Sequence, residues 1–181
     1  MFARLCGNDA KAPIKTTTDA YRELCPPDDK FKDEFASAHF SANLIERARY
    51  CLERIETAKH GEHDELQVLG ADDVHVEHIM PQKIRTKKAK DDFGDWITYL
   101  GGNSASQHSK YVDRIGNLTL FAGALNIGAS NNPFARKKGA YKDSGILLTK
   151  ELSKQSNFKF RDIDKRSMDL AEIAVTLWPR P

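Results

Sequence analysis

The sequence predicts an α+β fold that is mostly helical, with a short β-hairpin and one helix at its centre and further helices packed around them. Two runs of strand-forming residues, 74–78 (VHVEH) and 117–121 (NLTLF), supply the two strands. An Asn-Pro pair at 132–133 marks the start of the central helix. Segments with apolar residues at helical spacing near both ends of the chain predict the packing helices.

The composition is that of a water-soluble globular protein. Of the 181 residues, 40% are hydrophobic and 30% are charged, and the mean hydropathy is -0.59. No apolar run approaches the roughly 20 residues that cross a bilayer, and the first residues lack the layout of a secretion signal. We therefore expect a cytoplasmic protein with no membrane partner.

The cysteine pattern excludes one class of metal site. Cys6, Cys25 and Cys51 are far apart in the sequence, and no C-x-x-C pair occurs. Neither a disulfide framework nor a structural zinc site built from cysteines is predicted.

The charge is unevenly distributed along the chain. Residues 1–70 carry 10 basic and 13 acidic side chains, a net charge of −3, whereas residues 71–181 carry 18 and 13, a net charge of +5. We expect residues 1–70 to be a helical part that packs on a core formed by residues 71–181, in one compact domain. A basic second part fits a polyanionic partner as well as a simply solvated surface.

Two helices are predicted before the first strand. The segment 16–24 reads as a short helix that stops before Pro26 and Pro27. In the segment 41–61, Asn43 with Glu46 resembles a capping box and Gly61 lies at the end. Its apolar face comprises Leu44, Ala48, Cys51, Leu52 and Ile55. His60 and His63 in the following polar stretch are assigned no function.

The segments after the first strand predict less regular structure. Residues 91–100 read as a short amphipathic helix ended by Gly101 and Gly102, and residues 101–110 read as an irregular loop. A last helix is expected from about residue 162, with Asp162 or Asp164 as its cap and Pro179 as its stop.

Four polar residues lie at the strand ends and in the loop between the second strand and the central helix: Glu77, His78, Asn117 and Asn126. Cutting a phosphodiester requires a base that deprotonates water and a cation that neutralises charge on the phosphate. A neutral His78 is suited to be the base. The carboxylate of Glu77 and the amide oxygen of Asn126 are ligands of the kind that Mg²⁺ or Mn²⁺ prefers.

These residues resemble a known family. The order E-H-I-x-P-Q at 77–82, I-G-N-L-T-L at 115–120, an Asn nine residues after Asn117, and S-N-N at 130–132 before a basic helix is similar to the HNH, or ββα-metal, endonuclease motif. More narrowly, it resembles the C-terminal HNH domain of GmrSD-type and SspE-type modification-dependent restriction proteins. The similarity covers residues 71–181 well and residues 40–60 loosely.

The resemblance implies a role for each motif residue. His78 corresponds to the general base, and Asn117 to the central Asn that braces the loop and orients this base. Glu77 and Asn126 correspond to the metal ligands, although Glu77 is longer than the Asp that many HNH enzymes have there. The implied function is a DNA endonuclease of an anti-phage restriction system, which acts as a nickase or cuts both strands. A nucleotide-hydrolysing sensor domain is expected N-terminal to the nuclease in the full-length protein.

Basic side chains near the motif predict DNA contacts. Lys83 and Arg85 follow the motif directly, and Arg136, Lys137 and Lys138 lie on the central helix. Such residues bind phosphates without reading sequence, so little sequence preference is expected.

Two other classes of function remain open at this stage. One is a nucleic-acid-binding module with an inert nuclease site, and the other is a structural or partner-binding domain in which the Glu-His pair is incidental. His75 shares the strand with Glu77 and is interpreted as structural rather than as an outer ligand.

Overall fold

The computed structural model describes residues 13–61, 74–85, 90–91, 94–122 and 131–181. The elements follow one another as α2 (Pro13–Leu24), α3 (Asp28–Ser37), η1 (Ala42–Leu44), α4 (Ile45–His60), β1 (Val74–His78), β2 (Lys90–Asp91), β3 (Gly94–Asp95), α7 (Trp96–Leu100), α8 (Ser104–Tyr111), η3 (Ile115–Asn117), β4 (Leu118–Ala122), α10 (Phe134–Lys142), α11 (Leu147–Lys150), η4 (Glu151–Lys154) and α12 (Phe160–Leu177). The predicted α+β, mostly helical fold is confirmed.

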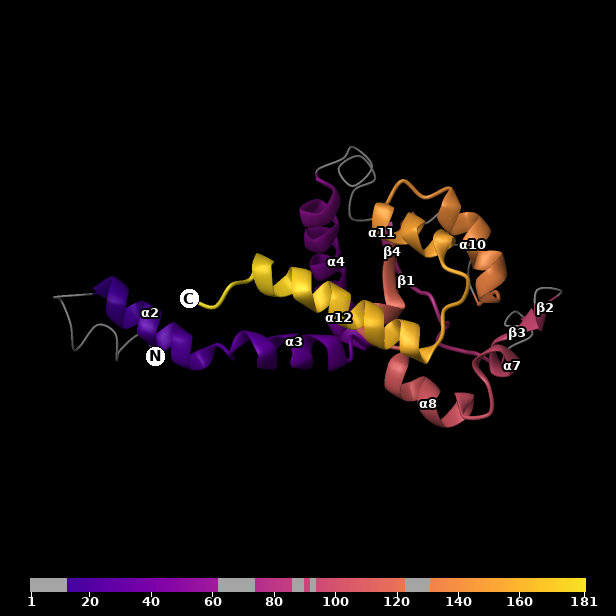
Figure 1. Cartoon of the computed structure of the whole chain (residues 1–181), viewed down its shortest axis with the longest axis horizontal. Helices are drawn as coiled ribbons and strands as arrows, with labels where there is room; N and C mark the ends of the chain where they lie inside the picture. The colour runs from indigo at the N-terminus through magenta and orange to yellow at the C-terminus, as the bar shows by residue number, and fades with distance from the viewer. Residues whose placement is uncertain (1–12, 62–73, 86–89, 92–93, 123–130) are drawn as a thin grey trace.

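The central sheet consists of β1 and β4, which pair antiparallel although about 40 residues separate them in the sequence. Glu77 lies opposite Thr119, and His78 lies opposite Leu118. In Figure 1 the two strands lie between α10 and α11 on one side and α8 on the other. This pairing brings the end of β1 beside the residues that enter β4.

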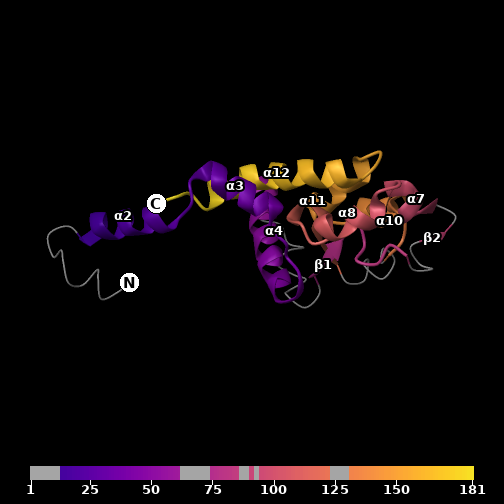
Figure 2. The same ribbon diagram turned by 90° about the horizontal axis from the view of Figure 1, so that it is seen from below.

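Helix α12 is the longest element and spans the molecule beside the sheet. It lies alongside α3 and also contacts α4 and η3 (Figures 1 and 2). At the far end, α2 extends beyond α3, and Arg180 donates from Nη2 to the Arg22 carbonyl. Helix α3 was not predicted, although Asp28 and Asp29 in its first turn and Phe31 with Phe35 at helical spacing are signals for it.

Two predicted helix caps are wrong in detail. Asn43 lies in η1 and the start of α4 has no side-chain cap, because a 3₁₀ turn leads directly into the helix. Asp162 is the third residue of α12 and accepts from the backbone N–H of Lys159, so it belongs to a capping box rather than being the cap itself. Asp164 instead accepts hydrogen bonds from Tyr111 and Arg114.

Two segments between the strands also differ from the prediction. Among the described residues of the segment 91–100, the helix comprises only Trp96–Leu100, since Asp95 caps it and strands β2 and β3 precede it. The segment 101–110 is largely the helix α8 rather than a loop. Its polar sequence lacks an apolar stripe, so periodicity gave no signal for it.

The interior holds two clusters of apolar side chains. One surrounds the motif and includes Ile79, Met80, Trp96, Phe121 and Phe134. The other joins residues of α4, β4 and α12, including Leu52, Ile55, Leu118, Leu120 and Leu170. The two faces of β4 contribute to different clusters, and all five of its residues are buried. The strand is therefore held from both sides, which fixes the position of the site at its start.

Helix α10 begins at Phe134, with Pro133 at the N-cap position instead of Asn132 as predicted. Of its buried residues, Lys137 and Tyr141 contact Glu77 and Phe121 of the sheet, whereas Phe134 stacks on Phe158. Among the described helices, none has the length and apolar character needed to cross a membrane.

Candidate active site

His78 forms a pair with Asp113 at the end of β1. Its Nε2 lies 3.2 Å from Oδ1 of Asp113, and the side chains of both residues are largely but not fully buried, at 14% and 19% exposure. Asp113 lies in the segment between α8 and η3 and is brought to His78 by the pairing of β1 with β4. The imidazole is thus held by a carboxylate at a position that solvent still reaches.

Glu77 faces the interior on the other side of the strand. Its Oε1 accepts a hydrogen bond of 2.5 Å from Nζ of Lys137, which also donates to the His78 carbonyl at 2.7 Å. The Lys137 side chain has no exposed surface and that of Glu77 has 9%. Neighbouring residues of one strand therefore form an ion pair in the interior and a histidine-carboxylate hydrogen bond nearer the surface.

The pKa shifts in the site have burial as their main cause. Burial raises the pKa of Glu77 and lowers that of Lys137, and in each case the opposite charge of the partner counteracts the shift. Burial also lowers the pKa of His78, with Asp113 opposing this shift, so the neutral imidazole is favoured near neutral pH. A neutral imidazole has a free lone pair, which is the state a general base requires.

Asn117 connects the ends of the two strands. Its Oδ1 accepts from the Met80 N–H at 2.8 Å, and its Nδ2 donates to the carbonyls of Met80 and Val112 at 2.9 and 2.7 Å. The side chain is completely buried. The Asn117 carbonyl also accepts from the N–H of Ile79, the residue after His78. These contacts fix the segment that carries His78 and leave the amide of Asn117 no free oxygen for a metal.

The structure brings three of the four predicted motif residues together, namely Glu77, His78 and Asn117. Asn126, the fourth, lies outside the described residues. His75 is exposed on β1. The motif residues that are described therefore lie at the paired ends of β1 and β4, as the sequence order suggested.

The residues predicted to bind DNA fall into two groups. Lys83, Arg85 and Arg136 are exposed and Lys138 is partly exposed, so their charges are accessible. Lys137 differs, because its ammonium group is buried against Glu77. The prediction that Lys137 contacts a DNA phosphate requires an exposed charge, and this conformation does not provide one.

The sequence did not predict the contact of His78 with Asp113 or that of Glu77 with Lys137. Asp113 lies four residues before Asn117, outside the motif, and only the folded loop shows that it contacts His78. Lys137 was read as one of several surface lysines, although its position between the buried residues Phe134 and Tyr141 at helical spacing was a signal that it faces inward.

The described residues include one of the two proposed ligands of a divalent cation, the carboxylate of Glu77. Within the described ranges there is no group of three or more His, Cys, Asp and Glu residues that could hold a metal. A hydrated Mg²⁺ needs fewer protein ligands and accepts a single carboxylate with water. Glu77 offers such an oxygen, but its Oε1 is bonded to Lys137, so a cation at this carboxylate uses the other oxygen or displaces the ammonium.

The chain matches a known protein family. The model of the family described as GmrSD restriction endonucleases, C-terminal domain, matches residues 25–173, which is most of the chain and includes every described residue of the site. No curated protein shows a significant similarity to this sequence.

Proposed function

We propose that this chain, which belongs to the family of GmrSD restriction endonuclease C-terminal domains, is a metal-dependent DNA endonuclease domain that nicks one strand at a time. Its family identifies it as a restriction nuclease and its substrate as DNA. The reaction, its base and its metal are proposed from the geometry of the site.

The contact between His78 and Asp113 carries this proposal. A carboxylate only accepts hydrogen bonds, so Asp113 favours the tautomer that has its hydrogen on Nε2 of His78. Nδ1 is then the nitrogen with the free lone pair. This is the arrangement of a general base that a second group orients.

His78 in this tautomer takes a proton from the attacking water at Nδ1. The imidazolium that forms is balanced by Asp113 at 3.2 Å. Asn117 keeps the strand end in place through Met80 and Ile79, so the base does not need to be repositioned during the reaction. Water attacks the phosphorus in line with the departing 3′ oxygen, and a single site cuts one strand per encounter.

The proposed ligands of the cation are Glu77 and Asn126, with Mg²⁺ or Mn²⁺ as the ion. When bound, such a cation neutralises negative charge on the phosphate and on the departing oxygen. Lys137 favours the charged form of Glu77 against the effect of burial and fixes the orientation of its carboxylate. Its ammonium also donates to the His78 carbonyl, so one side chain holds both the carboxylate and the backbone of the base.

Phosphate contacts hold the substrate in this proposal. Lys83 and Arg85 lie just after the motif and, with Gln82 and His108, line a cavity of about 470 Å³. Arg136 and Lys138 extend the basic surface on α10. Since these side chains meet the DNA backbone, the recognition of modified DNA is assigned to an N-terminal nucleotide-hydrolysing sensor domain of the full-length protein.

Nicking of a supercoiled plasmid tests the proposal. The wild-type domain is expected to nick in Mg²⁺ or Mn²⁺ and to stop when EDTA is added. His78→Ala should reduce the nicking rate roughly 10²- to 10⁴-fold, because the base is removed. His75→Ala is the matched control, since this histidine lies on the same strand but is exposed, and it should nick at the wild-type rate.

The same variants distinguish the two other classes of function. DNA retention in a gel shift without nicking in any divalent ion indicates an inert binding module. If His78→Ala leaves every activity unchanged, in a variant with normal circular dichroism, His78 is not the base and the Glu-His pair is incidental, as expected for a structural or partner-binding domain.

A further inference from the structure

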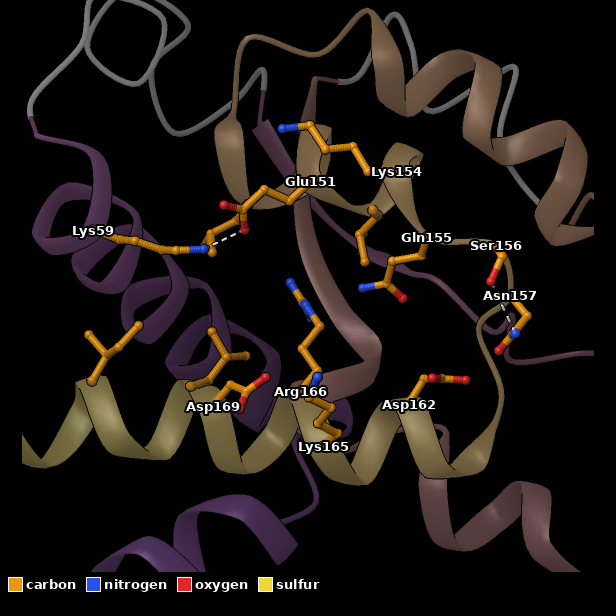
Figure 3. Close-up of a pocket in the computed structure, with 14 residues that line it drawn as sticks. Lys59, Glu151, Lys154, Gln155, Ser156, Asn157, Asp162, Lys165, Arg166 and Asp169 are labelled. Carbon is orange, nitrogen blue, oxygen red and sulfur yellow. Dashed lines mark hydrogen bonds and ion pairs between the residues drawn. The ribbon is translucent and has the colours of Figure 1, made fainter.

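A second cavity, separate from the motif, lies between α12 and the segment 151–157. Its volume is about 670 Å³, and side chains from α4, α11, η4 and α12 line it (Figure 3). Arg166 rises from α12 into this space, and the amide of Gln155 points into it from the opposite wall. None of the residues of the proposed nuclease site lines this cavity.

Arg166 brings a positive charge into the interior without a direct ion pair to a described carboxylate, although the charges of Glu151 and Asp169 act on it. Its Nη1 donates to the carbonyls of Gly116 and Leu118 at 2.9 and 2.6 Å. Its Nη2 is buried without a hydrogen-bond partner in the described part of the chain. Burial lowers the pKa of Arg166 to about 10, so the guanidinium stays charged at neutral pH. A buried charge of this kind is costly unless an anion approaches it.

The acidic residues of the lining are mostly engaged elsewhere. Glu151 is paired with Lys59, as Figure 3 shows, and Asp162 accepts the backbone N–H of Lys159. Asp169 is the acid of this lining whose negative charge acts on Arg166 together with that of Glu151, whereas Lys154 and Lys165 add two exposed positive charges. With Arg166 the remaining charges favour an anion.

We propose that this cavity binds a phosphorylated small molecule, whose phosphoryl group is attracted by Arg166 and hydrogen-bonded by Lys165 and Gln155. A phosphoryl group combines two negative charges with several acceptor oxygens, which suits one guanidinium, one ammonium and one amide. The site is independent of the proposed nuclease function, since it shares no side chain with it.

The apolar residues that line the cavity indicate which group the ligand carries besides its phosphoryl group. Leu148, Leu152 and Leu170 are buried and form an apolar wall, with Ile173 beside them. A bare phosphate fills little of about 670 Å³, a volume within the range of roughly 300–1,000 Å³ that is usual for small-molecule sites. The ligand therefore carries an apolar or flat group in addition to its phosphoryl group, which is the chemistry of a nucleotide.

Arg166 also connects this cavity with the segment around Asn117. The two carbonyls that it binds belong to the residues on either side of Asn117. A ligand that fixes the guanidinium is expected to stabilise residues 115–120. Slower amide hydrogen exchange in this segment upon ligand addition reports this effect without any assay of nuclease activity.

Calorimetric titration of the intact chain, without metal, tests the proposal. The probes are inorganic phosphate, pyrophosphate, a nucleoside diphosphate and the same nucleoside without phosphate. The diphosphate is expected to bind more tightly than pyrophosphate or phosphate, and the nucleoside alone is expected not to bind. The double variant Gln155→Ala, Lys165→Ala should weaken the diphosphate roughly tenfold or more, because it removes one neutral and one charged contact.

The matched control removes the same two residue types from another helix. Gln107 and Lys110 lie on α8 and do not line the cavity, so Gln107→Ala, Lys110→Ala should bind like the wild type. Absence of binding by every phosphorylated probe, or equal binding by the two double variants, overturns the proposal. Equal binding of the nucleoside and its diphosphate does so as well, because it removes the role of the phosphoryl group.

Discussion

Glu77 and His78 are adjacent on β1, but their side chains lie in opposite environments. Glu77 contacts the fully buried ammonium of Lys137, in the interior between the sheet and α10. His78 contacts Asp113 at a position where both side chains keep some exposure. Because successive side chains of a strand point to opposite faces, one dipeptide can supply both a carboxylate held by a buried partner and a base that solvent reaches.

The two pairs differ in the free-energy cost of removing one of their members. Removing one member of a buried pair leaves an uncompensated charge in a low-dielectric interior, whereas a partly exposed pair is relieved by water. We therefore expect the loss of Lys137 to lower mainly stability and the loss of Asp113 to slow mainly the reaction. The following predictions test this division, from the largest expected effect to the smallest.

Lys137→Met should have the largest effect on the free energy of unfolding. The variant leaves Glu77 buried without its cation, which costs about 3–5 kcal/mol when a buried pair is broken on one side. The measurement is urea unfolding followed by circular dichroism. Lys142→Met is the control, because this lysine is exposed on the same helix and its loss should change stability by less than about 0.5 kcal/mol.

The double variant Glu77→Gln, Lys137→Met separates charge from packing. With both charges gone, it should recover at least half of the stability that Lys137→Met loses. If Lys137→Met is as stable as the wild type, water reaches the carboxylate of Glu77 in the variant. The proposed difference in stability between the buried and the partly exposed pair is then wrong.

Asn117→Ala should lower both the free energy of unfolding and the nicking rate. It leaves the N–H and carbonyl of Met80 and the carbonyl of Val112 without their side-chain partner, at a cost of about 2–3 kcal/mol in unfolding free energy. Because the same contacts position His78, nicking should fall as well, even at temperatures where the variant is folded. Loss of stability with unchanged nicking would show that Asn117 does not position the base.

The fold class was predictable because strand-forming runs and apolar periodicity are local signals. Ala48, Leu52 and Ile55 of α4 were assigned to one apolar face, and all three are completely buried. Helix α8 was missed because its Ser, Gln and Lys residues show no apolar stripe. Contacts between distant residues give no local signal either. The carboxylate of Glu56, for example, accepts the backbone N–H groups of Leu147 and Leu148, 91 and 92 residues away.

The motif of the site was predictable, but the partners of its residues were not. Spacing and residue type pointed to Glu77, His78 and Asn117, which lie together in the structure. The ion pair with Lys137 and the hydrogen bond with Asp113 depend on how α10 and the segment before η3 pack against β1. Charged residues are normally exposed, so a sequence pattern favours the surface for Lys137 unless its buried neighbours are considered.

Asp113→Ala should change the reaction with little change in stability. The pair with His78 is partly exposed, so its loss should alter the free energy of unfolding by about 1 kcal/mol or less. Nicking should fall roughly tenfold, equivalent to about 1.4 kcal/mol, since the base remains but is no longer oriented. Asp113→Asn keeps an acceptor oxygen and should recover part of the rate. Equal rates for Asp113→Ala and wild type would remove Asp113 from the mechanism.

The smallest expected effect belongs to the exposed charges beside the motif. The double variant Lys83→Ala, Arg85→Ala should weaken DNA binding modestly and leave stability unchanged, because both side chains are exposed. Each lost phosphate contact lowers the slope of log binding constant against log salt concentration by about 0.9, so the slope should fall by about 1.8. Lys15→Ala, Lys30→Ala removes two exposed lysines from α2 and α3 and should leave the slope as it is. If both double variants reduce the slope equally, DNA binding depends on the total charge of the chain. Lys83 and Arg85 then do not form a specific DNA-binding surface.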